Sequence, residues 1–288
     1  MKFELEKPQS TEEAVSLLAT LGDSARVIAG GQSLLLMIRA GLVRPRVLVS
    51  LGSLTELQRI ETLAGGGLRI GALATHRRIL LSEAIRKNAG PLTDAVWHIG
   101  STPVRNFGTI GGNLCHNEMG SDPPSALLVL NANVECISGR GKRKIPLSEF
   151  ITGYFETCLE PDEILTGIEI PAPPEGRKTA YLKHTMRAGD LAVVGVAVSL
   201  SLKNGWCREA RIALGGVGPV SFRATDAEKL LSKNGLDDQL IDEAAAAAAA
   251  MSDPLTDAHA SADYRRKMVY VFVKRAIRQA LSEDGGDS

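Results

Sequence analysis

The sequence lacks the features that would draw it to nucleic acid or to a membrane. Its 33 basic and 33 acidic residues cancel, so no net field attracts it to an anionic polymer or surface. Aromatic residues make up only 4% of the chain, too few for a base-stacking surface. The longest apolar stretch, Leu191 to Leu202, is much shorter than the ~20 residues that cross a bilayer. We therefore expect no nucleic-acid partner and no membrane span.

The chain also has few cysteines, and they are spread too widely for a metal site. They lie about twenty or more residues apart without any CxxC pair, whereas iron–sulfur and zinc sites need clustered thiolates. We expect small buried side chains in a reducing compartment at Cys115, Cys136, Cys158 and Cys207. Because the first eight residues contain no apolar signal core, the expected location is cytoplasmic.

The pattern of apolar residues predicts an α+β fold that begins with a small α/β layer. Ser10 and Glu13 form a capping box, and the apolar residues after it keep helical spacing up to Gly22. Residues 26–29 and 46–50 have the composition of short buried strands. These elements define a first subdomain of about residues 1–53.

A second subdomain, about residues 54–173, mixes strands with helices. The expected strands are 68–72, 134–138 and 164–170, and the expected helices are 75–81, 90–97 and 125–130. Three prolines between residues 171 and 174 interrupt the strand pattern, because proline cannot donate to a sheet. We therefore predict that a first domain comprises residues 1–173 and a second comprises residues 174–288.

The second domain is predicted to be an antiparallel meander followed by helices. Alternating apolar residues favour strands at 180–186, 192–202 and 207–214. The alanine run 244–250 is strongly helix-forming, and a last helix is expected at about 264–281. The tail from Glu283 is expected to fray.

Two glycine-containing motifs are the candidates for ligand binding. The first is AGGQSLL at residues 29–35, between a predicted strand and a predicted helix, and the second is TIGGN at residues 109–113. Glycine has no Cβ, so its backbone N–H can approach an anion closely. Hydroxyl and amide side chains flank both glycine pairs. Two such turns could hold a diphosphate from two sides.

Taken singly, each glycine pair is better explained by an ordinary tight turn, because paired glycines are common. Gly30-Gly31 lacks the third glycine of GxGxxG, and the chain contains no GxxxxGK[ST] sequence. The histidines have no metal-ligand spacing, and no Ser/His/Asp arrangement is present. The sequence therefore supports neither a Rossmann NAD site, nor a P-loop, nor a catalytic triad.

In this order and about eighty residues apart, the two motifs resemble those of the FAD-binding medium subunits of molybdenum hydroxylases. This family includes the carbon monoxide dehydrogenase, xanthine dehydrogenase and quinoline oxidoreductase types. The resemblance covers the whole chain and includes the segments 103–108, 121–123, 161–165, 181–183 and 264–266. It implies a two-part FAD-binding domain of the PCMH or vanillyl-alcohol-oxidase type, followed by a smaller domain of antiparallel sheet and helices.

The resemblance assigns cofactor-binding roles to particular positions. Backbone amides of the first motif would hold the FAD diphosphate and the second motif would close on it, through Ala29, Gly30, Gly31, Gln32, Ser33, Leu34, Thr109, Gly111, Gly112 and Asn113. Asp122 would bind the ribose or ribityl part of FAD, Lys183 would lie near the flavin ring, and Leu165 would pack against that ring. No catalytic residue and no metal ligand is implied on this chain.

Several of these residues have simpler explanations when the resemblance is set aside. Asp122 could be the N-cap of the helix that follows it, Lys183 a strand lysine with a solvated head, and Leu165 a core residue. His116 could touch FAD, but a structural hydrogen-bonded role is the more general expectation for an isolated histidine. Leu191 stands where many relatives carry an aromatic residue that covers the flavin.

The resemblance implies that the chain transfers electrons within a complex. A large partner subunit with a molybdenum cofactor would oxidise the substrate, an N-heterocycle or another small molecule. A small partner with two [2Fe–2S] clusters would pass the electrons to FAD on this chain, which would deliver them to an external acceptor. The complex would be a dimer of heterotrimers. Gln32 stands where carbon monoxide dehydrogenases often carry histidine, which disfavours carbon monoxide as the substrate.

Two alternative functions stay open. One is a self-contained flavin oxidoreductase of the same fold, which would need its own catalytic group near the flavin. The other is a non-catalytic nucleotide-binding module, which would bind no flavin. The sequence identifies no catalytic group for the first alternative.

Overall fold

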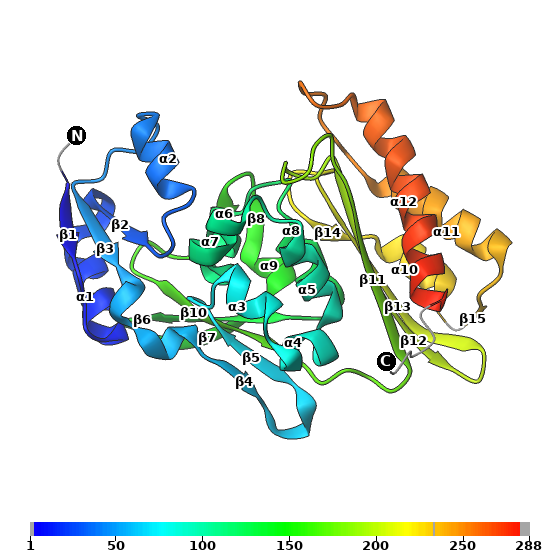
Figure 1. The fold of residues 1–288 in the computed structure, drawn as a ribbon, viewed down its shortest axis with the longest axis horizontal. Helices are drawn as coiled ribbons and strands as arrows, with labels where there is room; N and C mark the ends of the chain where they lie inside the picture. The colour runs from blue at the N-terminus through cyan, green and yellow to red at the C-terminus, as the bar shows by residue number, and fades with distance from the viewer. Residues whose placement is uncertain (1–2, 233, 283–288) are drawn as a thin grey trace.

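The computed structural model of the protein describes residues 3–232 and 234–282. In this part of the chain three units, each with its own sheet, follow one another along the long axis of the molecule (Figure 1). Each unit contains a cluster of buried apolar side chains. The predicted α+β class is confirmed, and so is the order of a two-part domain followed by a smaller sheet-and-helix domain.

The N-terminal unit is a small parallel sheet with two helices. Its strand order is β1-β3-β2. Its elements are β1 (Glu4–Glu6), α1 (Thr11–Leu21), β2 (Ala25–Ile28), α2 (Leu34–Arg39) and β3 (Val47–Ser50). The predicted capping box begins α1, because Ser10 Oγ accepts a hydrogen bond from Glu13 N at 3.1 Å. The Glu13 carboxylate accepts from the backbone N–H of Gln9 at 2.6 Å, one residue earlier than a standard box. Gly22, with φ +51°, ends the helix as predicted.

The middle unit is built on a five-stranded antiparallel sheet with helices packed against it. The strands, in sheet order, are β4 (Ile60–Thr62), β5 (Leu68–Gly71), β10 (Ile164–Ile170), β6 (Asn133–Ser138) and β7 (Gly141–Pro146). The helices are α3 (His76–Leu80), α4 (Glu83–Asn88), α5 (Gly90–Trp97), α6 (Thr102–Phe107), α7 (Ile110–His116), α8 (Asp122–Val129) and α9 (Leu147–Phe150). The three strands and three helices predicted for this subdomain are all present within a few residues of the expected bounds.

Short elements complete these two units. The 3-10 helices are η1 (Gly22–Ser24), η2 (Leu51–Ser53), η3 (Thr55–Gln58) and η4 (Ala64–Gly66), and a small hairpin is formed by β8 (Ile151–Gly153) and β9 (Glu156–Thr157). The buried cluster of the N-terminal unit includes Leu73, Ile137 and Ile164 of the middle unit. The two units therefore share an apolar contact.

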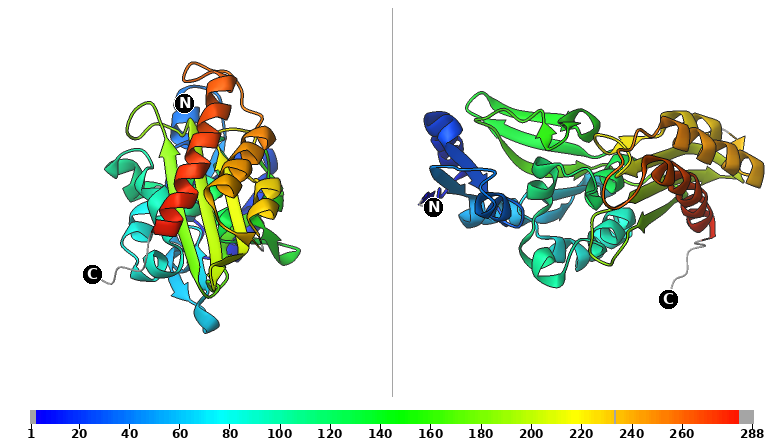
Figure 2. Two further views of the ribbon diagram at one scale, coloured as in Figure 1. Left: turned by 90° about the vertical axis from the view of Figure 1, so that its right-hand side faces the viewer. Right: turned by 90° about the horizontal axis from the view of Figure 1, so that it is seen from above.

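The C-terminal unit is an antiparallel sheet covered on its outer face by helices. Its strands are β11 (Arg177–His184), β12 (Val194–Lys203), β13 (Trp206–Gly215), β14 (Phe222–Arg223) and β15 (Asn234–Gly235). Its helices are α10 (Thr225–Leu231), α11 (Asp238–Met251) and α12 (Ala262–Ser282), and Figure 2 shows α11 and α12 on the side of the sheet away from the middle unit. The predicted meander and final helices are confirmed. The tail from Glu283 lies outside the described residues.

Helix α8 connects the middle and C-terminal units through packing. Every residue of α8 is buried, and the helix contacts α5 on one side and strands β12 and β13 on another. The proline-containing segment between Ile170 and Arg177 leads the chain from one sheet to the next. A domain boundary after residue 173 remains a prediction. Within residues 3–232 and 234–282, no helix has the length and apolar character needed to cross a bilayer.

The packing of α8 predicts a large loss of stability for Leu127→Ala. Leu127 is fully buried, so the truncation removes apolar contacts and leaves a cavity. We expect the free energy of unfolding to fall by about 2–5 kcal/mol in urea denaturation. Leu36→Ala is the matched control, because Leu36 is 62% exposed and its truncation should change stability by less than about 0.5 kcal/mol. Equal effects of the two substitutions would contradict the role given to α8.

Candidate functional site

A cavity of about 740 Å³ lies between the N-terminal and middle units and extends to the C-terminal unit. Its size falls within the range of small-molecule and cofactor sites, roughly 300–1,000 Å³. The walls come from the segment after β2, the start of α7, strand β10 and the loop between β11 and β12. Segments far apart in the sequence therefore meet around one space of cofactor size.

The first glycine motif brings unpaired backbone N–H groups to this cavity. Residues 30–33 line it, and Gly31 has φ +69°, a conformation that favours glycine. Among the described residues, none accepts a hydrogen bond from the backbone N–H groups of residues 30–33. The Gln32 side chain donates to the carbonyl oxygen of Gly30 at 3.1 Å, so it stabilises the turn. Successive unpaired amides of this kind form an anion-binding concavity.

The second glycine motif differs from the prediction, because it is the first turn of α7 and its amides are already paired. Thr109 is the N-cap, and its Oγ1 accepts from Gly112 N at 3.1 Å. Gly111 N donates to Ala72 O at 2.8 Å, and Asn113 N donates to Thr109 O at 3.0 Å. A Cβ on Gly111 would lie 2.6 Å from the Cβ of Ala72. The expectation of a second open turn was therefore wrong. This motif lines the cavity with two glycines, which have no side chains.

The two glycine motifs meet, as the sequence predicted. A Cβ on Gly30 would lie 1.9 Å from the carbonyl oxygen of Phe107, just before the second motif. A Cβ on Gly112 would lie 3.9 Å from the Cβ of Ala29. Glycine at position 30 therefore allows a direct backbone contact that no other residue would permit.

The other predicted residues of the two motifs also reach the cavity, together with three residues from elsewhere. Leu165 on β10 lines it and is buried, whereas Leu191 lines it from the β11–β12 loop and is 55% exposed. His116, at the end of α7, lines it and contacts the ring of Phe155 with a centroid separation of 5.1 Å. Burial lowers the pKa of the His116 imidazole. The lining residues from the motifs are Ala29, Gly30, Gly31, Gln32, Ser33, Leu34, Thr109, Gly111, Gly112 and Asn113.

Asp122 and Lys183 are not among the residues that line the cavity; they form a buried pair beside it. Lys183 Nζ lies 2.9 Å from Asp122 Oδ2, and the Tyr181 hydroxyl donates to Asp122 Oδ1 at 2.6 Å. Burial raises the pKa of the Asp122 carboxyl, although the charge of Lys183 and these hydrogen bonds oppose the increase. The N-cap of α8 is Ser121, so the alternative of Asp122 as the cap was wrong. The pair joins α8 to β11, and its cofactor-binding role remains a prediction.

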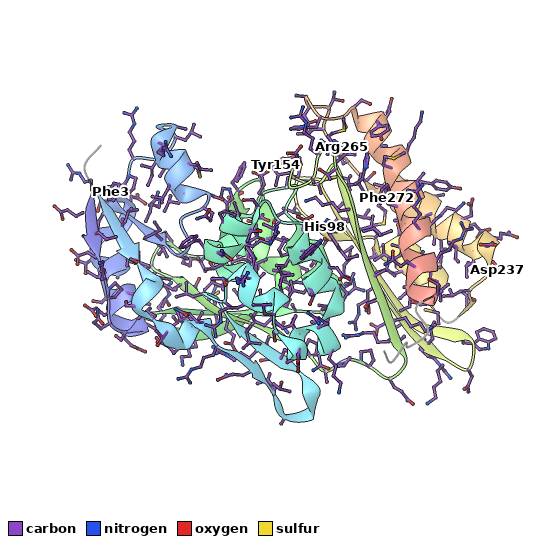
Figure 3. The ribbon with its side chains drawn as sticks, viewed as in Figure 1. Phe3, His98, Tyr154, Asp237, Arg265 and Phe272 are labelled. Carbon is purple, nitrogen blue, oxygen red and sulfur yellow. The ribbon has the colours of Figure 1, made fainter. Side chains whose placement is uncertain are left out.

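Arg265 holds in place the loop that carries Leu191, a connection that the sequence analysis did not identify. This buried arginine on α12, labelled in Figure 3, donates to the carbonyl oxygens of Val193 at 2.8 Å and Gly216 at 3.0 Å. It also pairs with Asp257 at 2.6 Å. The backbone of Gly216 donates in turn to the carbonyl of Met119 at 3.0 Å, next to the cavity residue Glu118. Helix α12 thus positions the C-terminal side of the cavity.

All four cysteines are free thiols; Cys136 and Cys207 are buried as expected, whereas Cys115 and Cys158 are only partly buried. Cys115 lines the cavity, and burial raises the pKa of the Cys115 and Cys136 thiols to about 12. Thiols with such pKa values are poor nucleophiles and poor metal ligands. In the part of the chain that the structure describes, no group of three or more His, Cys, Asp or Glu side chains is placed to hold a metal ion.

His76 lines the cavity, although the sequence analysis gave it no role. It is the first residue of α3 and is only 3% exposed. Burial, with a smaller contribution from the positive charge of Arg105, lowers the pKa of its imidazole to about 4. Its Nδ1 is enclosed and has no hydrogen-bond partner among the residues that the structure describes. This burial depends on how α3 and α6 pack together, so no local sequence signal could have revealed it.

The backbone contact at Gly30 predicts that Gly30→Ala is destabilising. The added methyl group would collide with the carbonyl of Phe107, so the two motifs would have to separate, at a cost of about 1–3 kcal/mol in unfolding free energy. Gly139→Ala is the control, because a Cβ at Gly139 meets no described atom within 4 Å. This substitution only reduces the backbone freedom of the unfolded chain. Urea unfolding of both variants would measure the difference. Equal stability of Gly30→Ala and Gly139→Ala would contradict the close packing of Gly30 on Phe107.

The lowered pKa of His76 predicts a pH-dependent stability. The folded protein holds this imidazole neutral down to about pH 4, whereas the unfolded chain binds the proton near pH 6.5. Burial of the neutral imidazole therefore carries no proton-linked penalty above pH 6.5, and the free energy of unfolding falls as the pH drops towards 4, by up to about 3 kcal/mol. In urea unfolding between pH 7.5 and 4.5, wild type should lose more stability than His76→Leu. Parallel losses in the two proteins would show that His76 does not titrate as described.

Comparison with known proteins agrees with this architecture over the whole chain. The family model of the FAD binding domain in molybdopterin dehydrogenase matches residues 1–173, and that of the CO dehydrogenase flavoprotein C-terminal domain matches residues 179–280. The medium subunit of nicotine 6-hydroxylase from Paenarthrobacter nicotinovorans is 38% identical, over 95% of each chain.

Two solved structures share the complete fold. A chain of carbon monoxide dehydrogenase from Hydrogenophaga pseudoflava, in a form lacking the Mo-pyranopterin moiety, superposes with a TM-score of 0.95, 34% identity and 98% coverage of both chains. A chain of quinoline 2-oxidoreductase from Pseudomonas putida 86 superposes with a TM-score of 0.91, 34% identity and 97% coverage of both chains. The protein therefore belongs to the family of FAD-binding flavoprotein subunits of molybdopterin dehydrogenases.

Proposed function

We propose that this chain is the FAD-carrying electron-transfer subunit of a heterotrimeric molybdenum hydroxylase or dehydrogenase. One observation carries the proposal: the two glycine motifs meet at a cavity of cofactor size in a chain that matches flavoprotein subunits along its length. When bound, FAD supplies the ability to accept and release electrons. The protein's contribution is to hold, orient and shield it.

In this proposal the first motif holds the FAD diphosphate. The unpaired N–H groups of Gly30, Gly31, Gln32 and Ser33 supply donors to phosphate oxygens, with Ala29 and Leu34 at the ends of the turn. The positive φ of Gly31 fits such a concave backbone. The fit supports FAD, because this region offers donors and no side chain at its two glycines.

The second motif bounds the opposite side of the diphosphate. Gly112 allows α7 to lie close to Ala29 of the first motif, Gly111 packs α7 on Ala72, and Thr109 fixes the start of that helix. Asn113 accepts from Ser121 at 2.9 Å through Oδ1, which leaves its Nδ2 as a donor for the cofactor. We propose that Leu165 packs against the flavin.

Asp122 and Lys183 are retained as proposed cofactor-binding residues. Asp122 directly follows Ser121, a cavity-lining residue, and both charged groups are nearly shielded from solvent. Their ion pair and the Tyr181 hydroxyl fix the position of α8 against β11 at the edge of the cavity. We propose that the same Asp122–Lys183 pair provides polar groups for the cofactor at this edge of the cavity.

The partners carry the metal centres. A large subunit with the molybdenum cofactor oxidises the substrate, a small subunit with two [2Fe–2S] clusters relays the electrons, and this chain passes them to an external acceptor. The complex is a dimer of heterotrimers. The support lies in the similarity to a medium subunit of nicotine 6-hydroxylase and to chains of two solved dehydrogenase and oxidoreductase structures.

We propose that the complex oxidises an N-heterocycle or another small molecule. The support is the similarity to subunits of proteins named for nicotine and quinoline. We also retain the division into an FAD-binding domain at residues 1–173 and a C-terminal flavoprotein domain at residues 174–288. A cytoplasmic location remains our prediction, based on the free, widely spaced cysteines.

The proposal is tested by flavin retention in Gly112→Val. A valine there would place its Cβ 2.9 Å from Thr109 Oγ1 and extend towards Ala29, where the diphosphate has to fit. We expect the wild-type protein to carry flavin absorption near roughly 450 nm and the variant to have lost most of it. Gly139→Val is the control and should keep full flavin occupancy, since nothing lies within 4 Å of its Cβ.

Two results would contradict the proposal. A properly folded wild-type chain that neither carries flavin nor takes it up would leave only a nucleotide-binding module without flavin chemistry. Turnover of an organic substrate by the isolated chain would instead show a self-contained flavin oxidoreductase.

A further inference from the structure

His76 occupies a position directly behind the meeting point of the two glycine motifs. Its backbone N–H donates to the carbonyl oxygen of Gly108 at 2.9 Å. A Cβ on Gly108 would lie 2.9 Å from His76 Cδ2 and 3.2 Å from its Nε2, so this edge of the ring packs on Gly108. Gly108 in turn approaches Gly30, because a Cβ added to Gly30 would lie 3.1 Å from the Cα of Gly108. His76 is thus separated from the first motif by one glycine.

The imidazole of His76 does not have the hydrogen bonds that a buried histidine usually makes. Nδ1 is enclosed and has no partner within the described part of the chain, which is uncommon because most buried polar atoms in folded proteins are paired. Since Nδ1 is shut off from the cavity, the ring can reach a ligand only through its other edge, at Nε2. His76 and Gly108 both line the cavity. A bound molecule is therefore a natural partner for Nε2.

A positive charge lies close to this ring. Arg105 donates to the carbonyl oxygens of Ile99 at 2.7 Å and Gly100 at 3.3 Å, and both of those residues line the cavity. The guanidinium also lies over the ring of Trp97, 5.6 Å from its centroid. Its charge disfavours a second positive charge on His76 and favours a negative charge in the cavity nearby. A neutral imidazole beside this charge can donate one N–H to an anionic oxygen.

We propose that His76 is a cofactor-binding residue whose Nε2–H donates to an oxygen of the dinucleotide diphosphate, with Arg105 contributing electrostatic attraction from behind the cavity wall. The inference rests on the proposed function, since it names a contact for the same cavity. The contact from His76 differs from those of the motif amides because it comes from a side chain, which can be replaced without changing the backbone of either motif.

Binding of FAD and of ADP to the full chain tests this proposal. The proteins are wild type, His76→Leu, His76→Gln and His259→Leu, where His259 is an exposed histidine of the C-terminal unit. After removal of bound flavin, we expect His76→Leu to bind both FAD and ADP about tenfold more weakly than wild type. His76→Gln keeps an N–H donor and should recover part of the affinity. His259→Leu should bind as wild type does.

Thermal unfolding of the flavin-free proteins separates this role from a structural one. His76→Leu removes an enclosed, unpaired nitrogen, so its flavin-free melting temperature at pH 7.5 should be no lower than that of wild type. Weaker FAD binding without a loss of flavin-free stability is the result that supports the proposal. A parallel loss of both would overturn it, because His76 would then only support the fold.

Three further outcomes are decisive. Unchanged FAD affinity in His76→Leu would overturn the proposal and leave an ordered water as the partner of the ring. Weaker binding of FAD with unchanged binding of ADP would overturn the diphosphate assignment, because the contact would lie in the flavin half. Absence of FAD binding by the wild type itself would instead be a failure of the proposed function.

Discussion

The site depends on one backbone contact, the approach of Gly30 to the carbonyl of Phe107. Only a residue without Cβ permits this approach, and it brings the turn after β2 against the junction between α6 and α7. Residues 30–33, in the same turn, line the cavity, and their N–H groups have no hydrogen-bond partner among residues 3–232 and 234–282. Unpaired amides cost stability unless water or a ligand satisfies them. The same geometry that keeps the two units together therefore creates a site for an anion.

The sequence predicted most elements and most cavity residues, for physical reasons that can be named. Capping residues such as Ser10 and the alternation in the C-terminal strands are local signals. Strands β1 and β7 left no such signal, because most of their side chains are exposed and show no apolar alternation. The pairing of the Gly111 amide was unpredictable, since its acceptor, the carbonyl oxygen of Ala72, depends on the packing of α7. The Thr109 cap on Gly112 is a local signal that the sequence prediction missed.

The sequence did not predict which polar side chains are buried and paired with one another. Asp122 and Lys183 bond to each other and to Tyr181 in the packing between α8 and β11. Such a pair contributes little net stability, because desolvation offsets the Coulomb attraction, but it strongly penalises any arrangement that separates its members. Together with Arg265 on α12, it fixes how the C-terminal unit meets the cavity. Burial of this kind follows from tertiary packing.

Residue-resolved hydrogen–deuterium exchange with and without FAD tests the central claim most directly. We expect FAD to slow exchange at the backbone amides of residues 30–33, which have no protein partner in the described structure. The amides of Gly111 to Asn113 are already paired and should change much less. Unchanged exchange at residues 30–33 in a chain saturated with FAD would contradict the claim that these amides hold the cofactor.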